Sequence, residues 1–116
     1  MPTILFVYGT LKRGCRNHSV LAGARFLGAA WTRALYGLVN CGQYPGLLLS
    51  DPGERVSGEL WEVDAPLLAR LDEFEDVPRE YVRGAVELES GTAAEAYFYN
   101  LDPEGLAGCG QEWREE

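Results

Sequence analysis

Hydrophobic residues recur at helical spacing in one stretch of the chain, residues 64–77. Asp64 is a suitable N-cap, and Pro66 fits a first turn, where backbone N–H groups have no partner within the helix. Pro78 disfavours the helical conformation at Val77 and therefore ends the element. The pattern predicts a helix whose apolar positions are Leu67, Leu68, Leu71 and Phe74.

One acidic residue falls on the apolar side of this predicted helix. On a helical wheel with about 100° per residue and Leu67 at zero, the apolar arc runs from roughly 340° to roughly 100°, and Glu75 lies at roughly 80°. The nearby acids fall outside the arc, at roughly 140°, 240° and 180°. These residues are Asp72, Glu73 and Asp76.

Two interpretations of an inward Glu75 remain open, because burying an unpaired carboxylate is costly. In the first, a frayed last turn leaves it in water, or it pairs with Arg79 or Arg83. In the second, it lines a pocket as a general base or acid. Partial burial beside other acids would then raise its pKa toward neutrality, which suits proton transfer.

The rest of the chain reads mainly as strands. Thr3–Tyr8 is a continuous apolar run that predicts a central strand buried on both faces. Alternation over 81–88 and 92–99 predicts a hairpin around Ser90-Gly91. The other expected strands lie within 24–35 with a bend near Gly28, at 47–49, and over 55–63 with a bulge at Gly58. Residues 36–45 are turn-rich and are expected to end in a loop, and residues 17–21 predict a short helix capped by Asn17.

About six strands without regular βαβ alternation predict an α+β fold. We expect a small, mostly antiparallel, curled or barrel-like sheet with one main helix packed on it. The length of 116 residues predicts one domain over 1–116. The tail, residues 101–116, is Gly-rich and acidic, which predicts a mobile segment, although Trp113 offers a side chain that can dock on the body.

The formal charge of −8 gives no general attraction for phosphate backbones, so nucleic acid is not an expected partner. The only basic concentration is local, over Lys12, Arg13 and Arg16 with His18 nearby. A small-molecule partner is therefore expected. The sequence carries no indication of an oligomeric state.

Apolar runs are only a few residues long, and the first of them follows no basic leader. We therefore expect no membrane span and no signal peptide. Three widely separated cysteines argue against a disulfide framework, and no His or Cys spacing suggests a metal site. A cytoplasmic location fits best. The cysteines are Cys15, Cys41 and Cys109.

The loop after the first strand, GTLKRG over Gly9–Gly14, is the second candidate for chemistry. A buried strand holds this loop rigidly at one end. Gly9 allows close approach of the backbone, and consecutive N–H groups in such a turn can point at one acceptor. The loop is either a cradle for an anion or oxyanion, or an ordinary strand-exit turn. Its spacing is not that of a phosphate-binding P-loop.

Several short motifs in order resemble the γ-glutamylcyclotransferase-like superfamily, and most closely its γ-glutamylamine cyclotransferase and AIG2-like branch. The similarity runs from about Ile4 to Tyr99. The motifs are YGTLK with the following Arg13-Gly14 (Tyr8–Gly14), Asn17-His18, VxGEL (Val56–Leu60), LDxFE (Leu71–Glu75) and YxR (Tyr81–Arg83).

This resemblance implies a compact, barrel-like α+β fold with a cavity at one end, and a reaction without metal or organic cofactor. The α-amine of a γ-glutamyl compound attacks its own γ-carbonyl, which yields 5-oxoproline and a free amine. Glu75 takes the position of the family's catalytic glutamate. The substrate loop maps onto Tyr8, Gly9, Thr10 and Leu11, and we add Tyr81 and Arg83 as substrate-binding candidates for which a structural role is equally open.

Two other functions are compatible with these residues. The pocket can hold a γ-glutamyl or other carboxylate ligand without turnover. Alternatively, Glu75 and an acid such as Glu59 can form the paired carboxylates of a hydrolase. Thr10 and Leu11 differ from the YGSN loop of the larger enzymes that act on γ-glutamyl amino acids, which favours a γ-glutamyl amine or amide as substrate.

Overall fold

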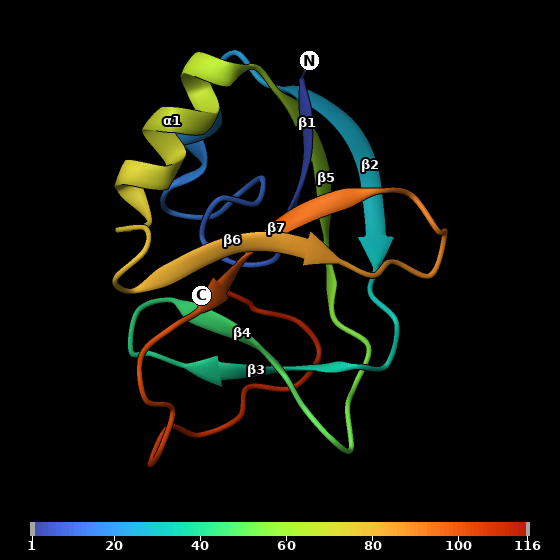
Figure 1. The fold of residues 1–116 in the computed structure, drawn as a ribbon, viewed down its shortest axis with the longest axis vertical. Coiled ribbons are helices and arrows are strands. Elements are labelled where there is room, and N and C mark those ends of the chain that lie inside the picture. The colour runs from blue at the N-terminus through green and yellow to red at the C-terminus, as the bar shows by residue number, and fades with distance from the viewer. Residues whose placement is uncertain (1, 116) are drawn as a thin grey trace.

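A computed structural model of the chain describes residues 2–115 as one α-helix packed on a curled sheet (Figure 1). In chain order the elements are β1 (Thr3–Val7), η1 (His18–Leu21), β2 (Arg25–Trp31), β3 (Tyr36–Asn40), β4 (Pro45–Leu49), β5 (Ser57–Val63), α1 (Ala65–Phe74), β6 (Tyr81–Val86) and β7 (Ala94–Tyr99). The predicted α+β class and the 81–99 hairpin are confirmed.

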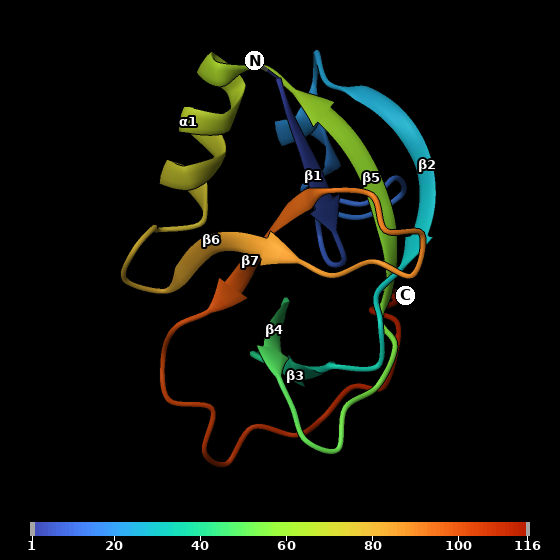
Figure 2. The same ribbon diagram turned by 45° about the vertical axis from the view of Figure 1, so that its right-hand side comes forward.

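The sheet is mixed and open. Its strand order is β2-β5-β1-β7-β4-β3, with β6 on β7. β1 and β4 both lie parallel to β7, whereas the other pairs are antiparallel. The sheet curls strongly, as expected (Figure 2), but it does not close into a barrel. The reason is that β1, β4 and β6 all pair with β7, so the sheet forks there.

The central strand β1 is buried on both faces, as its apolar run predicts. Leu5 and Val7 point into a cluster that contains Leu67 and Leu71 of α1. Phe6 and Tyr8 point into a second cluster on the opposite face of the sheet. Because β1 is packed between two cores, the residues that follow it leave the sheet from a firmly held position.

Helix α1 begins as predicted but ends earlier. Asp64 Oδ1 accepts a hydrogen bond from the Leu67 N–H at 2.9 Å. The helix ends at Phe74, with Glu75 as its C-cap. Asp76 adopts a left-handed conformation (φ 56°), its N–H bonds to Glu73 O, and Val77 N–H bonds to Asp72 O. This is the Schellman arrangement, so the helix is closed by hydrogen bonds and not frayed.

Some local expectations were wrong because distant chain segments decide the outcome. The stretch over 36–45, in which turn-rich sequence predicted no strand, contains β3, which pairs along its whole length with β4. The pairing of β2 with β5 shifts register between Phe26 and Gly28, near the predicted bend, but Gly58 is not a bulge and pairs regularly with Ala30. A Cβ at Gly58 would lie 2.5 Å from the Val7 carbonyl oxygen, so glycine there permits close strand approach. Asn17 does not cap η1.

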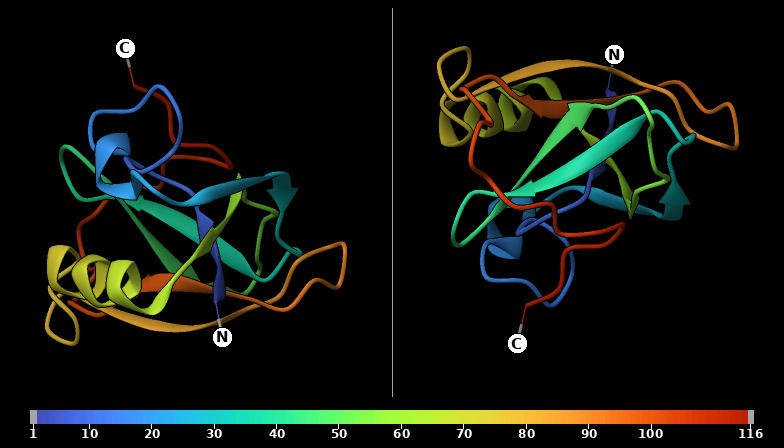
Figure 3. Two further views of the ribbon diagram at one scale, coloured as in Figure 1. Left: turned by 90° about the horizontal axis from the view of Figure 1, so that it is seen from above. Right: turned by 90° about the horizontal axis from the view of Figure 1, so that it is seen from below.

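The described part of the tail, residues 101–115, packs against the body, which differs from the mobility that its composition suggests. Cys109 N–H bonds to Leu38 O at 3.0 Å on β3. The Trp113 side chain is only 9% exposed, and its carbonyl accepts a hydrogen bond from Lys12 Nζ at 2.7 Å. Figure 3 shows the tail beside the loop that follows β1. Glu116 lies outside the described residues.

No helix within residues 2–115 combines the length and apolarity that a membrane crossing requires.

Candidate active site

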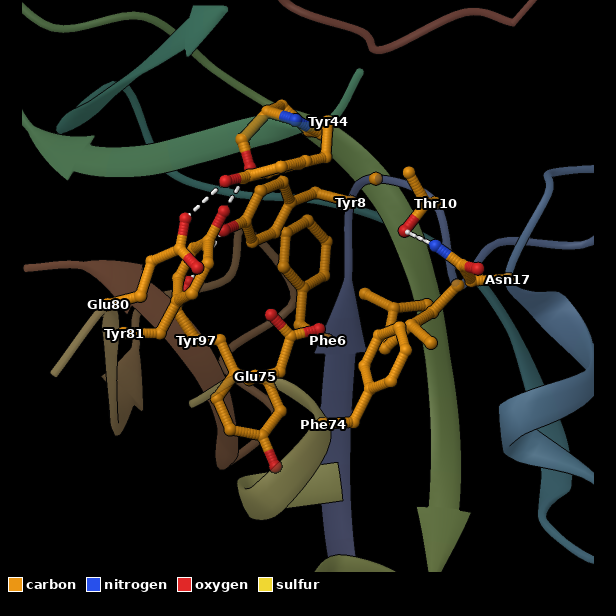
Figure 4. Close-up of a pocket in the computed structure, with 14 residues that line it drawn as sticks. Phe6, Tyr8, Thr10, Asn17, Tyr44, Phe74, Glu75, Glu80, Tyr81 and Tyr97 are labelled. Carbon is orange, nitrogen blue, oxygen red and sulfur yellow. Dashed lines mark hydrogen bonds between the residues drawn. The ribbon is translucent and has the colours of Figure 1, made fainter. Parts of the chain in front are cut away.

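A cavity lies between the end of β1, the C-cap of α1 and the hairpin of β6 and β7 (Figure 4). Its interior measures about 140 Å³, whereas one water needs about 10–15 Å³, so a small organic molecule can enter. It is lined by Phe6, Val7, Tyr8, Gly9, Thr10, Leu11, Asn17, Tyr44, Pro45, Phe74, Glu75, Glu80, Tyr81 and Tyr97.

Glu75 points into this cavity from the end of α1. It is half-buried, and its carboxylate forms no hydrogen bond or ion pair with any other residue in the described range. Arg79 pairs with Asp76 instead, and Arg83 pairs with Asp72. The salt bridge that would have made Glu75 an ordinary surface acid is therefore not formed.

The surroundings of Glu75 favour its protonated form. Burial, and to a smaller extent the negative charge of Glu80, raise the pKa of Glu75 to about 7. A carboxyl group with this pKa exchanges protons readily near neutrality, because both of its forms are populated. The helical wheel selected this residue for its inward position. The structure adds that burial and the nearby Glu80 charge bring its pKa close to neutrality.

The loop after β1 lines the same cavity and contains backbone donors without a partner in the described chain. The N–H groups of Gly9, Thr10 and Leu11 bond to no acceptor among residues 2–115. The loop is closed by the Lys12 N–H, which bonds to Gly9 O at 3.1 Å. Asn17 braces it, since its N–H bonds to Thr10 O at 3.0 Å and its Nδ2 donates to Thr10 Oγ1 at 3.1 Å. Consecutive free amides in a fixed turn can hold an anion.

Gly9 has a structural reason to be glycine. A Cβ at this position would lie 2.7 Å from Pro45 Cγ. The backbone of the loop therefore packs directly against the Pro45 ring at the start of β4, and both residues line the cavity.

Two tyrosines that the sequence selected form the floor, and their hydroxyls are already engaged. Tyr8 donates to Tyr97 O at 2.6 Å and accepts from the Leu47 N–H at 3.1 Å. Tyr81 donates to Pro45 O at 2.7 Å. Burial is the main cause that raises the pKa of both phenols above 10. These residues offer aromatic surface to a ligand, while their hydroxyls hold the strands in place.

All predicted site residues line the cavity except Arg83. The Arg83 guanidinium holds both oxygens of Asp72, at 2.9 and 3.0 Å, and also Glu95 Oε1 at 2.7 Å. Tyr97 donates its hydroxyl to Asp72 Oδ1 at 2.7 Å. The hydrogen bond from Arg83 is the main reason that the pKa of Asp72 is lowered. This network ties the last turn of α1 to the hairpin, three positions before Glu75.

Sequence reasoning missed Glu80 and Tyr44, which face each other at the cavity. The Tyr44 hydroxyl donates to Glu80 Oε2. Glu59, the acid suggested as a partner for Glu75, does not line the cavity and is held by Arg13 and the Trp61 indole. The sequence offered one indication for Glu80, namely that it immediately precedes Tyr81 of the YxR motif.

Phe74 was expected in the core, yet its side chain is 46% exposed and forms part of the cavity rim. The other lining residues that were not predicted as site residues are Phe6, Val7, Asn17, Pro45 and Tyr97. Within residues 2–115 the structure contains no group of three or more His, Cys, Asp or Glu side chains arranged to hold a metal ion.

Comparison with known sequences assigns the chain to a protein family. The family profile described as "Gamma-glutamyl cyclotransferase, AIG2-like" matches residues 5–115. The chain belongs to this family. The family and its named members indicate an enzyme of the γ-glutamylcyclotransferase type.

Two curated relatives illustrate the similarity. A putative gamma-glutamylcyclotransferase of Vibrio cholerae is 44% identical over 93 residues, which cover 80% of this chain and 79% of the relative. The gamma-glutamylaminecyclotransferase of Mus musculus is 43% identical over 93 residues, which cover 73% of this chain. The matched region spans 62% of the length of that mouse protein.

Solved structures agree on the fold. A crystal structure of an AIG2-like protein from Mus musculus superposes with a TM-score of 0.81 at 36% identity, covering 95% of this chain and 87% of the mouse chain. A uropathogenic E. coli-specific protein also gives a TM-score of 0.81, at 26% identity, covering 93% of this chain and 87% of that one. One helix on an open, mixed sheet is therefore the shared architecture.

Proposed function

We propose that this protein is a γ-glutamylamine cyclotransferase-type enzyme that converts a γ-glutamyl amine or amide to 5-oxoproline and a free amine. One observation carries the proposal: the unpaired, half-buried carboxylate of Glu75 shares a cavity with the loop over Gly9, Thr10 and Leu11, whose backbone amides have no acceptor among residues 2–115. The family membership and the printed names of the relatives support the same reaction class.

In this reaction the protein needs no covalent bond to the substrate, and its main task is to hold the substrate in a reactive conformation. The nucleophile and the carbonyl belong to one molecule, so the main requirement is to hold the γ-glutamyl group in a curled conformation. The amides of the loop bind the negative charge that develops on the γ-carbonyl oxygen, and the substrate carboxylate. The rings of Tyr8 and Tyr81 form the aromatic surface against which the aliphatic part of the substrate packs.

Glu75 accounts for the proton transfers. The α-nitrogen starts as an ammonium group with three protons and ends as the single N–H of a lactam. It forms a bond to the γ-carbon, and the bond from that carbon to the leaving nitrogen breaks. Glu75 removes the two surplus protons in turn and delivers them to the leaving –NHR group, which departs as RNH₃⁺. No water is consumed, and a pKa of about 7 lets the carboxyl group act in both directions.

The alternatives are a binding module without turnover and a carboxylate-based hydrolase. The hydrolase version that pairs Glu75 with Glu59 finds no support, because Glu59 lies outside the cavity and is held by Arg13. A binding module would use the same residues but would not need a titratable group at position 75. Replacing that group therefore separates binding from catalysis.

The experiment is a mass-spectrometric screen for 5-oxoproline in ¹⁸O-labelled water, with γ-glutamyl amines, γ-glutamyl amino acids and glutathione as substrates. We expect the wild-type protein to release unlabelled 5-oxoproline from a γ-glutamyl amine. Glu75→Gln is expected to lose at least about 10²-fold in kcat. Glu73→Gln is the matched control, because Glu73 is exposed and does not line the cavity.

Three results would contradict the proposal. A linear product that contains ¹⁸O would identify a hydrolase. Undiminished turnover in Glu75→Gln would remove the role of that residue. Binding of a γ-glutamyl amine without any product from the wild-type protein would identify a binding module.

A further inference from the structure

The cavity carries negative charge and no positive charge from the protein. Its charged lining residues are Glu75 and Glu80, and no Lys, Arg or His of the described chain lines it. The remaining walls are largely aromatic. A site of this composition attracts organic cations, because carboxylates and aromatic faces both stabilise an ammonium group.

Glu80 lines the cavity and is held there by its own segment and by a neighbouring ring. Its N–H bonds to Asp76 O at 2.9 Å, and its carbonyl accepts from the Asn100 N–H at 2.7 Å. The Tyr44 hydroxyl engages only Oε2, so Oε1 has no partner among residues 2–115. Glu80 and Tyr44 are both half-buried, unlike the fully buried floor beneath them.

The arrangement of the cavity separates its anion-binding and cation-binding sides. Figure 4 shows Thr10 on one side, Glu80 and Tyr44 on the other, and Glu75 between them. In the reaction proposed above, the amides near Thr10 hold the anionic parts of the γ-glutamyl group, and Glu75 reaches both reacting nitrogens. The substituent on the leaving nitrogen then extends toward the side of the cavity that holds Glu80.

We propose that Glu80, positioned by Tyr44, is a specificity-determining residue that recognises a positive charge on the leaving amine, so that the preferred substrates are γ-glutamyl derivatives of diamines or polyamines. This inference rests on the proposed function and names its substrate class. The Glu80 carboxylate pairs with the distal ammonium group, and the Tyr44 ring contacts its methylene groups. A neutral alkyl amine of the same length gains none of the charge pairing.

The test compares γ-glutamyl-1,4-diaminobutane with γ-glutamylpentylamine, in which a methyl group replaces the distal ammonium. We expect the wild-type protein to prefer the cationic substrate by about tenfold in kcat/KM, as suits a partly exposed charge pair. In Glu80→Gln and Glu80→Ala the ratio should fall to about one. Glu73→Gln removes the same charge from an exposed position outside the cavity and should keep the wild-type ratio.

The ratio is the informative quantity because Glu80 also acts on Glu75. Removing the charge of Glu80 lowers the pKa of Glu75 and changes the rate with every substrate. That change cancels between two substrates that share the γ-glutamyl group. A ratio that stays near tenfold in both Glu80 variants would overturn the inference. An equal loss for both substrates, with the ratio kept, would place Glu80 at the α-ammonium group or at Glu75 and would also overturn it.

A binding measurement separates this inference from the proposed function. Calorimetry with Glu75→Gln, and with Glu75→Gln/Glu80→Gln, measures the affinity for the same two compounds without turnover. Preferential binding of the cationic compound that disappears in the double variant supports the role of Glu80, even if the wild-type protein forms no 5-oxoproline. Equal affinities for both compounds in Glu75→Gln would overturn that role, whatever the result of the turnover screen.

Discussion

At the scale of single residues, the position of Glu75 costs the fold stability in its ionised form. The Schellman closure of α1 fixes Glu75 at the C-cap, with its side chain in the cavity and without a cationic partner in the described chain. A buried carboxylate without such a partner is destabilising when charged. The site therefore trades stability for a carboxyl group that can lose and regain a proton near neutrality.

This trade predicts a pH-dependent effect of Glu75→Gln on stability. The pKa of Glu75 rises from 4.5 to about 7 on folding, so between these values the folded protein keeps a proton that the unfolded chain releases. The free energy of unfolding of the wild-type protein therefore falls as pH rises through this window. We expect Glu75→Gln to be more stable than wild type by about 1–3 kcal/mol at pH 8, and nearly equal at pH 4.5. Urea denaturation across this range measures the difference, and a constant difference at all pH values would contradict the prediction.

Individual site residues differ in how far the sequence alone could identify them. Glu75 was found because helical periodicity is a local property, and the wheel places an acid inside an apolar arc. Glu80 was not found, because it reaches the cavity only through the folding of the segment after α1 against Tyr44. The YxR motif suggested that Arg83 belongs to the site, whereas its guanidinium forms ion pairs with Asp72 and Glu95.

At the scale of elements, the Asp72–Arg83 pair connects the end of α1 with β6. Both side chains are 27% exposed, so this is a partly buried, bidentate ion pair and differs from a fully solvated one. Tyr97 adds a hydrogen bond from β7 to the same carboxylate. Three elements thus meet at Asp72, and their junction fixes the direction in which Glu75 leaves the helix.

We therefore expect Arg83→Ala to impair catalysis without touching the substrate. Loss of the guanidinium leaves Glu95 without a partner and Asp72 with only the Tyr97 hydroxyl, and it is expected to lower stability by about 1–2 kcal/mol. Because Glu75 is then held less firmly, kcat should fall about tenfold while KM changes little. Steady-state kinetics and thermal unfolding measure both effects.

Arg79→Ala is the matched control for this prediction. Arg79 is 68% exposed and pairs with Asp76 at the surface, so its loss should change stability by less than about 0.5 kcal/mol. A rise in KM with unchanged kcat in Arg83→Ala would instead indicate that Arg83 contacts the substrate, as its motif had suggested.

Local and distant determinants also explain which elements the sequence predicted. Helix α1 carries its own N-cap and periodicity, and the β6–β7 hairpin carries its own turn. By contrast, β3 lies in a turn-rich stretch and becomes a strand only because β4 pairs with all of its residues. Curling without closure follows from the three partners of β7, which no local pattern encodes.

At the scale of the whole molecule, the tail connects two regions that are distant in sequence. Its backbone pairs with β3 near Val39, and its end packs beside the loop after β1. Lys12 reaches the Trp113 carbonyl, and the Arg16 N–H bonds to Glu115 Oε1 at 2.8 Å. The loop that offers free amides to the cavity is therefore supported from outside by the tail.

This support predicts that Trp113→Ala weakens substrate binding although Trp113 does not line the cavity. Loss of a buried indole is expected to lower stability by about 2–4 kcal/mol. Since the tail then releases Lys12 and Arg16, hydrogen exchange should accelerate in residues 9–17 as well as in residues 105–115, and KM should rise more than kcat falls. Exchange mass spectrometry and steady-state kinetics test the two parts separately.

Trp31→Ala provides the comparison, because Trp31 is 37% exposed on β2 and its ring lies 4.5 Å from the guanidinium of Arg55, a residue outside the loop after β1. Its loss should leave exchange in residues 9–17 unchanged. If Trp113→Ala accelerated exchange in the tail alone and left KM as in the wild type, the loop would owe its geometry to β1, Pro45 and Asn17 without help from the tail. If exchange accelerates in both regions, the order of the loop after β1 depends on a contact with the tail, which lies almost a full chain length away. The tail then has a structural role that its composition does not reveal.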